Sequence, residues 1–134
     1  MATHEFTPLE WREDGLALLD QTKLPAEETW LRPKRVEEVA DAIRRLAVRG
    51  APAIGVAAAY GLVVALEDAE DSEGDLDRRF ERAAKLLLAT RPTAVNLRWA
   101  LEQGEEAWSL LRDLTRGRAI AGLLDWARAL HADD

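Results

Sequence analysis

The segment Pro52–Leu66 constrains the fold of this chain more than any other, because its side chains are apolar almost all the way round a helix. A surface helix carries one apolar stripe, whereas a helix that is hydrophobic on every side has to be buried. Gly55 and Ala59 lie four residues apart and would let another element approach closely. Gly61 costs roughly 1 kcal/mol relative to alanine in a helix, so we expect tight packing or a bend there. The segment therefore predicts a central helix that the other elements surround.

Length and charge limit the class of protein. The chain has 134 residues, which suits one domain with one core, and we expect residues 1–134 to form a single domain. Its formal net charge of -7 disfavours non-specific binding to nucleic acid or to an anionic membrane, but is compatible with a local cationic pocket for a small phosphate. The longest apolar run, residues 51–66, is short for a membrane span, and the N-terminus does not resemble a signal peptide. We therefore expect a cytoplasmic protein.

Neither a metal centre nor a cofactor is expected. The chain contains no cysteine, which excludes a thiolate nucleophile and a cysteine-based metal site. His4 and His131 lie near opposite ends of the sequence, and neither has a second histidine or a carboxylate cluster at ligand spacing. The acidic stretch at residues 67–77 does not match the spacing of a calcium loop and is interpreted as a solvated loop.

Two regions of different hydrophobic periodicity follow one another. In the β region, residues 1–32, Leu9–Arg12 and Leu16–Leu19 flank an Asp-Gly hairpin signal, and Thr29–Leu31 is expected to add a third strand. Residues 33–134 show helical spacing, with apolar faces that predict about five helices. The expected fold class is therefore α+β, with a small N-terminal antiparallel β-sheet followed by a bundle of about five α-helices. Four of these apolar faces consist of Val36, Val39, Ala40, Ile43 and Ala47, then Phe80, Ala83, Ala84, Leu87 and Leu88, then Leu97, Leu101, Gly104, Trp108 and Leu111, and, after a separating Gly117, Leu123, Leu124, Ala127 and Leu130.

An arginine, a glycine and a proline-opened helix follow one another at Arg49-Gly50-Ala51-Pro52. Proline is favoured at the first helical position, because its missing N–H would have no partner there. Two compatible interpretations stay open. In one, Gly50 is the left-handed residue that ends the preceding helix, with Arg49 as the cation of the last turn. In the other, Arg49, Gly50 and the free N–H groups of the helix start bind a phosphate or a carboxylate.

A second arginine–proline junction begins at Arg91. Thr93 is expected to cap the following helix, with Asn96 at its third position. Arg91 precedes this helix start and could bind an anion there, and the alternative is a surface arginine before a capped helix. If the second and fourth helices start on the same side of the molecule, the two junctions can converge on one phosphate-bearing ligand.

Three blocks of the sequence resemble the methylthioribose-1-phosphate isomerase family. The blocks are Leu18–Pro25, Val48–Gly61 and Ala89–Leu97, and they occur in the family's order and at about its spacing. The wider family includes ribose-1,5-bisphosphate isomerases and regulatory subunits of initiation factor 2B, but the forms of the first and third blocks favour the methylthioribose branch. The resemblance covers essentially the whole chain, but only the N-terminal domain of the family.

The resemblance implies an aldose–ketose isomerase of methionine salvage, which converts 5-methylthioribose 1-phosphate to 5-methylthioribulose 1-phosphate without an obligatory metal. It also implies that Arg49, Gly50, Ala51 and Arg91 bind the substrate. These are the residues that the two junctions had already selected as an anion site.

The chain also departs from the family pattern. The family's catalytic cysteine and aspartate lie in a C-terminal Rossmann-like domain, which we expect to be absent from residues 1–134, so no residue here is assigned a catalytic role. We expect the chain alone to be inactive, with a sugar phosphate and the missing C-terminal domain as partners, and a homodimer at full length. The alternatives are an enzyme similar to ribose-1,5-bisphosphate isomerase and a non-catalytic regulatory binding module similar to the initiation-factor subunits.

Overall fold

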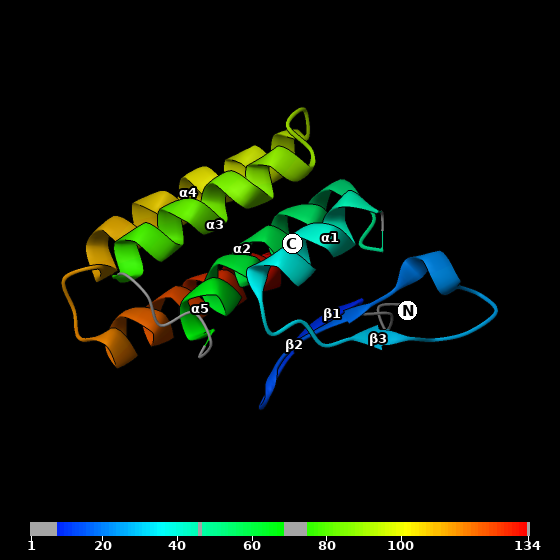
Figure 1. Ribbon diagram of the computed structural model, residues 1–134, viewed down its shortest axis with the longest axis horizontal. Helices are drawn as coiled ribbons and strands as arrows, with labels where there is room; N and C mark the ends of the chain where they lie inside the picture. The colour runs from blue at the N-terminus through cyan, green and yellow to red at the C-terminus, as the bar shows by residue number, and fades with distance from the viewer. Residues whose placement is uncertain (1–7, 46, 69–74, 134) are drawn as a thin grey trace.

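A computed structural model of the chain describes residues 8–45, 47–68 and 75–133 (Figure 1). In this part of the chain, a three-stranded antiparallel sheet precedes five helices, which confirms the predicted fold class. Figure 1 shows α3 and α4 on one side of α1 and α2, with the sheet on the other side. The elements in chain order are β1 (Leu9–Arg12), β2 (Gly15–Leu19), the short 3-10 helix η2 (Gln21–Lys23), β3 (Trp30–Leu31), α1 (Val36–Arg44), α2 (Ala51–Glu67), α3 (Leu76–Thr90), α4 (Val95–Leu111) and α5 (Arg116–Asp133).

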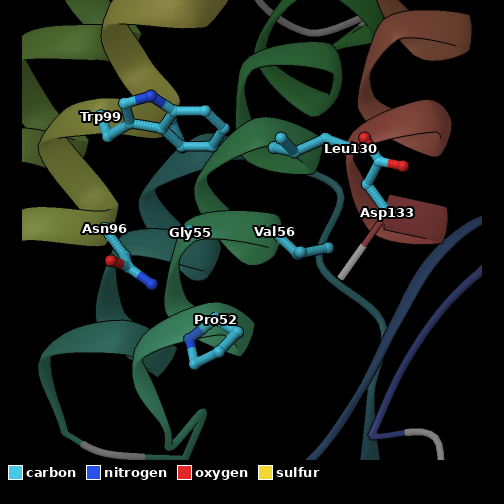
Figure 2. Close-up of a pocket in the computed structure, with 8 residues that line it drawn as sticks. Pro52, Gly55, Val56, Asn96, Trp99, Leu130 and Asp133 are labelled. Atoms are coloured by element: carbon cyan, nitrogen blue, oxygen red, sulfur yellow. The ribbon is translucent and has the colours of Figure 1, made fainter.

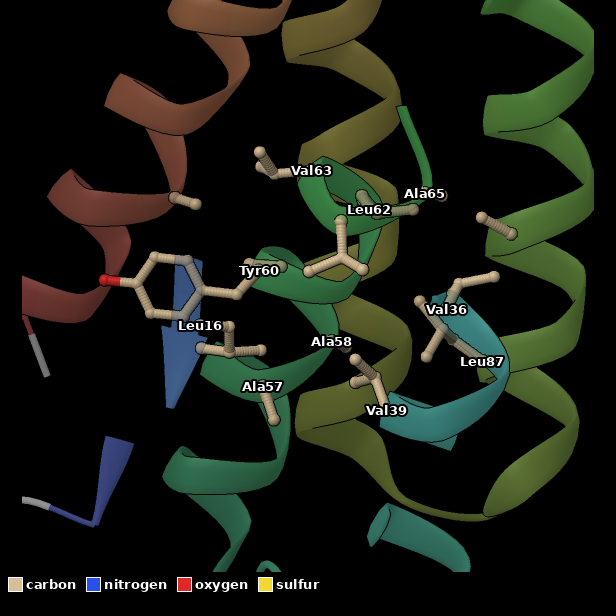
Figure 3. Close-up of a cluster of buried hydrophobic side chains, with 14 of the residues drawn as sticks. Leu16, Val36, Val39, Ala57, Ala58, Tyr60, Leu62, Val63, Ala65 and Leu87 are labelled. Atoms are coloured by element: carbon tan, nitrogen blue, oxygen red, sulfur yellow. The ribbon is translucent and has the colours of Figure 1, made fainter. Parts of the chain in front are cut away.

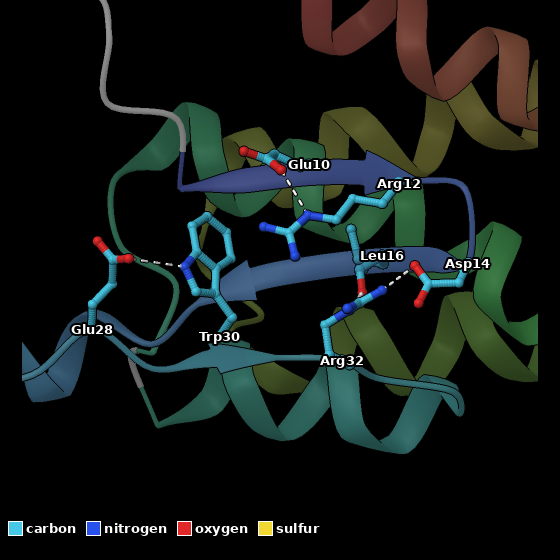
Figure 4. Close-up of polar contacts among 7 residues, drawn as sticks. All are labelled: Glu10, Arg12, Asp14, Leu16, Glu28, Trp30 and Arg32. Carbon is cyan, nitrogen blue, oxygen red and sulfur yellow. Dashed lines mark hydrogen bonds and ion pairs between the residues drawn. The ribbon is translucent and has the colours of Figure 1, made fainter.

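The sheet has β2 in its centre and follows the predicted hairpin. Leu9 pairs with Leu18 and Arg12 pairs with Gly15, whose positive φ of 124° is an angle that glycine adopts readily. Charged side chains cover one side of the sheet, where the guanidinium of Arg12 binds Glu10 at 2.8 Å and lies 4.7 Å from the centre of the Trp30 ring (Figure 4). The sheet therefore presents a polar side to solvent while β2 is buried.

Helix α2 occupies the centre of the molecule, as its apolar circumference predicted. Every residue from Ile54 to Leu66 is buried, and all four other helices pack against α2. Figure 3 shows Leu16 of β2, Val39 of α1 and Leu87 of α3 gathered around it. At Gly61, a Cβ atom would lie 3.1 Å from Val39 Cγ1 and 3.2 Å from Leu87 Cδ1, so tight packing is the outcome at that glycine.

Helices α2 and α4 run in the same direction. Gly55, near the start of α2, lies against Asn96 and Ala100, near the start of α4, whereas Leu62 lies against Gly104, further along both helices. A Cβ atom at Gly55 would be only 3.1 Å from the backbone oxygen of Asn96, so the two backbones are in close contact there. The prediction that this glycine admits a neighbouring element is confirmed, and the neighbour is α4.

Two arginines bind the C-terminal end of α2. The guanidinium of Arg79, which is buried in α3, donates to the backbone oxygens of Ala65 at 2.9 Å and Asp68 at 2.8 Å. Arg116 of α5 donates to the backbone oxygen of Leu66 at 3.3 Å. The last carbonyl groups of a helix have no partner within the helix, and this end carries the negative pole of the helix dipole. The buried guanidinium of Arg79 and the exposed Arg116 therefore both satisfy this end.

Several expected boundaries are wrong by a few residues. Helix α1 ends at Arg44, so Ala47 lies beyond it, although its side chain is buried as expected and its N–H donates to the Ala42 oxygen at 2.9 Å. Gly117 lies in the first turn of α5 and does not precede that helix. In the acidic stretch, residues 69–74 lie outside the described residues, and Asp75 caps α3 by accepting the Arg78 N–H at 2.8 Å.

Replacing Arg79 with methionine should lower the free energy of unfolding by roughly 2–4 kcal/mol, because buried carbonyl groups at the end of α2 lose a charged donor. Urea unfolding followed by circular dichroism measures this change. Arg78→Met is the matched control on an exposed neighbouring position of α3 and should shift stability by no more than about 0.5 kcal/mol. Equal effects of the two variants would contradict the assigned role of Arg79.

Candidate functional site

The first arginine junction is the N-terminal end of α2 and not the end of α1. Gly50 is the N-cap of α2, with φ 90° and ψ 134°, whereas the C-cap of α1 is Arg45, with φ -92°. The interpretation of Gly50 as the cap of the preceding helix, with Arg49 in its last turn, is therefore wrong. The physical reason is that two buried residues, Ala47 and Val48, stand between α1 and Gly50.

The start of α2 is open. A Cβ atom at Gly50 would have no neighbour within 4 Å, and Arg49, Gly50 and Ala51 are exposed. The helix begins at Ala51, so Pro52 stands at its second position, one residue later than predicted. The first helical hydrogen bond runs from the Ile54 N–H to the Gly50 oxygen at 3.0 Å, and no side chain caps this helix start in the described part of the chain. Backbone N–H groups of the first turn are therefore directed outward without an intrahelical acceptor.

The second junction has a similar helix start. The N-cap of α4 is Ala94, which makes no side-chain cap hydrogen bond, so the prediction that Thr93 caps this helix is wrong and Asn96 stands at the second position. A turn explains the shift, because the Ala94 N–H donates to the Arg91 oxygen at 2.9 Å and places Thr93 inside the turn. Arg98 Nη2 holds the same turn by donating to the Pro92 oxygen at 3.0 Å.

The two helix starts lie at the same end of the bundle, because α2 and α4 are parallel and Gly55 is packed against Asn96. This meets the condition under which both junctions can serve one ligand. Arg49, Gly50 and Ala51 lead into α2, and Arg91, which is half-buried, forms the C-cap of α3 just before α4. Two parallel helices present two positive dipole ends, so an anion at this end of the bundle is favoured.

A hollow of about 140 Å³ lies beside these helix starts (Figure 2). Figure 2 shows Pro52 at one end of it, with Trp99 and Leu130 at the other. Its wall combines the first turns of α2 and α4 with the last turn of α5. The residues that line it are Pro52, Gly55, Val56, Asn96, Trp99, Ala100, Leu130 and Asp133.

Asp20, for which no role was predicted, supports the segment that leads into the first junction. Its buried carboxylate accepts the Thr22 N–H at 3.0 Å and Arg45 Nη1 at 3.2 Å. Burial disfavours the charged form, but the hydrogen bonds from Thr22 and Arg45 outweigh it, so the pKa of Asp20 lies below its usual value. The next residue, Gln21, donates its N–H to the Ala47 oxygen at 2.9 Å. Aspartate side chains often accept the backbone N–H two residues later in a turn, and this tendency could have pointed to Asp20.

His131 takes part in a hydrogen bond with another side chain. Its Nδ1 lies 2.8 Å from the hydroxyl of Tyr60. Burial raises the pKa of this hydroxyl, although the positive charge of Arg128 acts in the opposite direction. His4 lies outside the described residues. Among the residues that the structure does describe, no group of three histidine, cysteine or acidic side chains could hold a metal ion, and no helix is long and apolar enough to cross a membrane.

Comparison with known proteins finds similarity to initiation factor subunits and to sugar-phosphate isomerases. Residues 47–120 match the Initiation factor 2 subunit family. A methylthioribose-1-phosphate isomerase of Ectopseudomonas mendocina is 45% identical over all 134 residues, which cover 37% of that protein. A 5-deoxyribose 1-phosphate isomerase of Moorella thermoacetica is 49% identical over 102 residues, which are 75% of this chain and 29% of that protein.

Two solved structures have the same fold. The translation initiation factor eIF-2B subunit delta from A. fulgidus superimposes with a TM-score of 0.86 at 38% identity, over 97% of this chain and 38% of that chain. The 5-methylthioribose 1-phosphate isomerase from Pyrococcus horikoshii superimposes with a TM-score of 0.83 at 31% identity, over 99% of this chain and 40% of that chain. The chain thus spans well under half the length of the relatives that it matches.

Replacing Gly55 with alanine should force α2 and α4 apart at their starts, because the new Cβ would lie 3.1 Å from a backbone oxygen. Overpacking of this kind costs about 1–3 kcal/mol, from which the better helix propensity of alanine recovers roughly 1 kcal/mol. Gly117→Ala is the matched control, since a Cβ there meets nothing within 4 Å, and it should be neutral or slightly stabilising. Thermal unfolding of both variants measures the difference, and a more stable Gly55→Ala variant would contradict the close contact.

Replacing Asp20 with asparagine should lower the free energy of unfolding at neutral pH by about 1–3 kcal/mol, because the buried carboxylate is held by charged and neutral donors. Because the pKa of Asp20 is lowered in the folded state, its carboxylate stabilises the protein at pH values above its ordinary pKa of 3.8. This stabilisation is lost as the pH falls through the folded-state pKa. The difference between wild type and variant should therefore shrink at acid pH. Asp41→Asn, at an exposed partner of the same Arg45, should change stability by less than about 0.5 kcal/mol. Urea unfolding from pH 7 to pH 3 tests this, and a difference that does not depend on pH would contradict it.

Proposed function

Because this chain belongs to the initiation factor 2 subunit family, we propose that it is the sugar-phosphate-binding part of an aldose–ketose isomerase. The proposed reaction converts 5-methylthioribose 1-phosphate to 5-methylthioribulose 1-phosphate, as a cytoplasmic step of methionine salvage. Relatives that carry the name methylthioribose-1-phosphate isomerase align with the chain from end to end, which supports this substrate.

One observation carries the proposal: two parallel helices start side by side, neither has a side-chain cap among the described residues, and each start follows an arginine. We assign Arg49 and Arg91 to neutralising the phosphate of the substrate, since one guanidinium group can donate two parallel hydrogen bonds to a phosphate. The N–H groups of Gly50 and Ala51 would orient the phosphate at the positive end of α2.

The chemistry of the substrate explains why a firm grip on phosphate is needed. The phosphate occupies the anomeric oxygen, so the sugar cannot open to a free aldehyde in the ordinary way. The ring has to open with the phosphate still attached, and a group that holds the phosphate can keep the reacting carbons in place throughout.

Catalysis is assigned to residues outside this chain. Proton transfer between neighbouring carbons needs positioned acid and base groups as well as binding. The resemblance places a catalytic cysteine and aspartate in a C-terminal Rossmann-like domain, and these 134 residues contain no cysteine. We propose that this domain completes the site, that the full-length protein is a homodimer, and that the chain alone binds substrate without turning it over.

Two other functions have support of their own. The Moorella thermoacetica relative favours a 5-deoxyribose 1-phosphate substrate, which differs from the proposed one at carbon 5. The initiation-factor structure favours a regulatory module with a protein partner, in which the anion site would serve no chemistry. A ribose-1,5-bisphosphate substrate remains the third alternative, and the choice of sugar phosphate in a binding experiment separates these cases.

Amide NMR titration of the chain with 5-methylthioribose 1-phosphate tests the proposal. Shifts should be confined to Gly50, Ala51 and the residues that follow Arg91, because these amides surround the proposed phosphate position. Arg49→Ala should weaken binding about tenfold or more through loss of a charge-assisted contact. Arg44→Ala, at an exposed position on the end of α1, is the matched control and should bind like wild type.

Inorganic phosphate and ribose 5-phosphate serve as ligand controls in the same titration. Absence of shifts with millimolar 5-methylthioribose 1-phosphate would contradict the proposed site. Detectable isomerisation by the purified chain would contradict the assignment of catalysis to another domain.

A further inference from the structure

The hollow beside the two helix starts has a wall that is unusual for a phosphate site. Its side chains are mainly apolar, with Val56, Trp99 and Leu130 as the large ones, and the charged side chain in its lining is the carboxylate of Asp133. Trp99 is 49% exposed, although tryptophan has a large apolar surface. A ligand that covers this ring would remove apolar area from water, which is favourable.

The hollow lies next to the proposed phosphate position. Pro52 and Asn96 line it and are the second residues of α2 and α4, so one end of the hollow lies beside the two helix starts. It then follows α2 from Pro52 to Val56, which corresponds to roughly 6 Å along the helix axis. This is the scale of a pentose ring, so a sugar held by its phosphate at the helix starts could place its far end beside Trp99 and Leu130 (Figure 2).

We infer that this hollow receives the end of the sugar remote from the phosphate, and that it selects a small apolar substituent such as methylthio over a second phosphate. The inference rests on the proposed function and specifies the part of the substrate that distinguishes the three candidate sugars. A second phosphate would have to approach the Asp133 carboxylate without a basic residue in the lining. A thioether would instead bury its methyl group among apolar side chains and bring its sulfur to the Trp99 ring, which is a favourable contact.

The inference predicts an order of affinity. The methylthio compound should bind about tenfold or more tightly than 5-deoxyribose 1-phosphate, because a small apolar extension in an apolar pocket gives discrimination of about that size. Ribose 1,5-bisphosphate should bind more weakly than 5-deoxyribose 1-phosphate, despite its greater negative charge. Calorimetric titration of the chain with the three compounds measures this order.

Indole N–H resonances provide a site-specific readout in the same samples. The chain has five tryptophans, and only the methylthio compound should shift the Trp99 indole strongly. Trp99→Ala should reduce the preference for methylthio over 5-deoxy to less than about threefold while leaving affinity for 5-deoxyribose 1-phosphate within about twofold. Trp30→Ala, which changes a half-buried tryptophan of the sheet, is the matched control and should preserve the preference.

A gain-of-function variant covers the case in which Trp99→Ala fails to fold. Leu130→Lys would place a cation at the far end of the hollow and should strengthen binding of ribose 1,5-bisphosphate by about tenfold while weakening binding of the methylthio compound.

Failure of this inference is distinguishable from failure of the proposed function. Equal affinity for all three compounds, with shifts at Gly50 and Ala51 but none at Trp99, would overturn the inference and leave phosphate binding intact. Preferential binding of the bisphosphate by the wild-type chain would also overturn it. Absence of any shift with all three compounds would overturn both, whereas the predicted order with a Trp99 shift supports both.

Discussion

The structure depends on one constraint, which is that α2 is apolar on every side. Such a helix is stable only if other elements cover its whole circumference, since its exposed apolar surface would otherwise remain in water. The other four helices and the sheet provide this cover, and every residue from Ile54 to Leu66 is buried as a result. Most of the chain can therefore be understood as the enclosure of one helix, with glycine at Gly61 where Val39 and Leu87 pack closely against it.

The backbone carbonyl and N–H groups at the two ends of α2 still need hydrogen-bond partners, and the two ends differ in this respect. The side chains of Arg79 and Arg116 bind the carbonyl groups of the C-terminal end. The N-terminal end, at Gly50 and Ala51, is exposed and carries no side-chain cap in the described part of the chain. Carbonyl groups that already bind guanidinium groups are occupied, whereas outward N–H groups can donate hydrogen bonds to an anionic ligand. This asymmetry is the physical basis for locating the proposed site at the N-terminal end.

Because α4 packs parallel to α2, a second positive dipole end lies beside the first. The contact of Gly55 with the Asn96 backbone sets the two helix starts side by side, and the Asp20 turn supports the chain just before Arg49. Geometry at the proposed phosphate site thus depends on residues that we do not expect to touch the phosphate. The hollow that Trp99 and Asp133 line lies beside the same two helix starts, so phosphate binding and discrimination between sugars are proposed to depend on the same packing of α4 on α2.

The sequence by itself determined the central position of α2, the hairpin and its third strand, and the choice of Arg49 and Arg91 as cations before helix starts. These follow from local signals, because hydrophobic periodicity and the proline and glycine positions act over a few residues. The tertiary structure alone decided that Gly50 begins α2 and does not end α1, and that Arg79 and Asp20 are buried. Each of these depends on distant groups: Ala47 is held by Gln21, and Arg79 meets carbonyl groups of another helix. Whether two helix starts share one end of a bundle is likewise a property of packing direction, which no local pattern encodes.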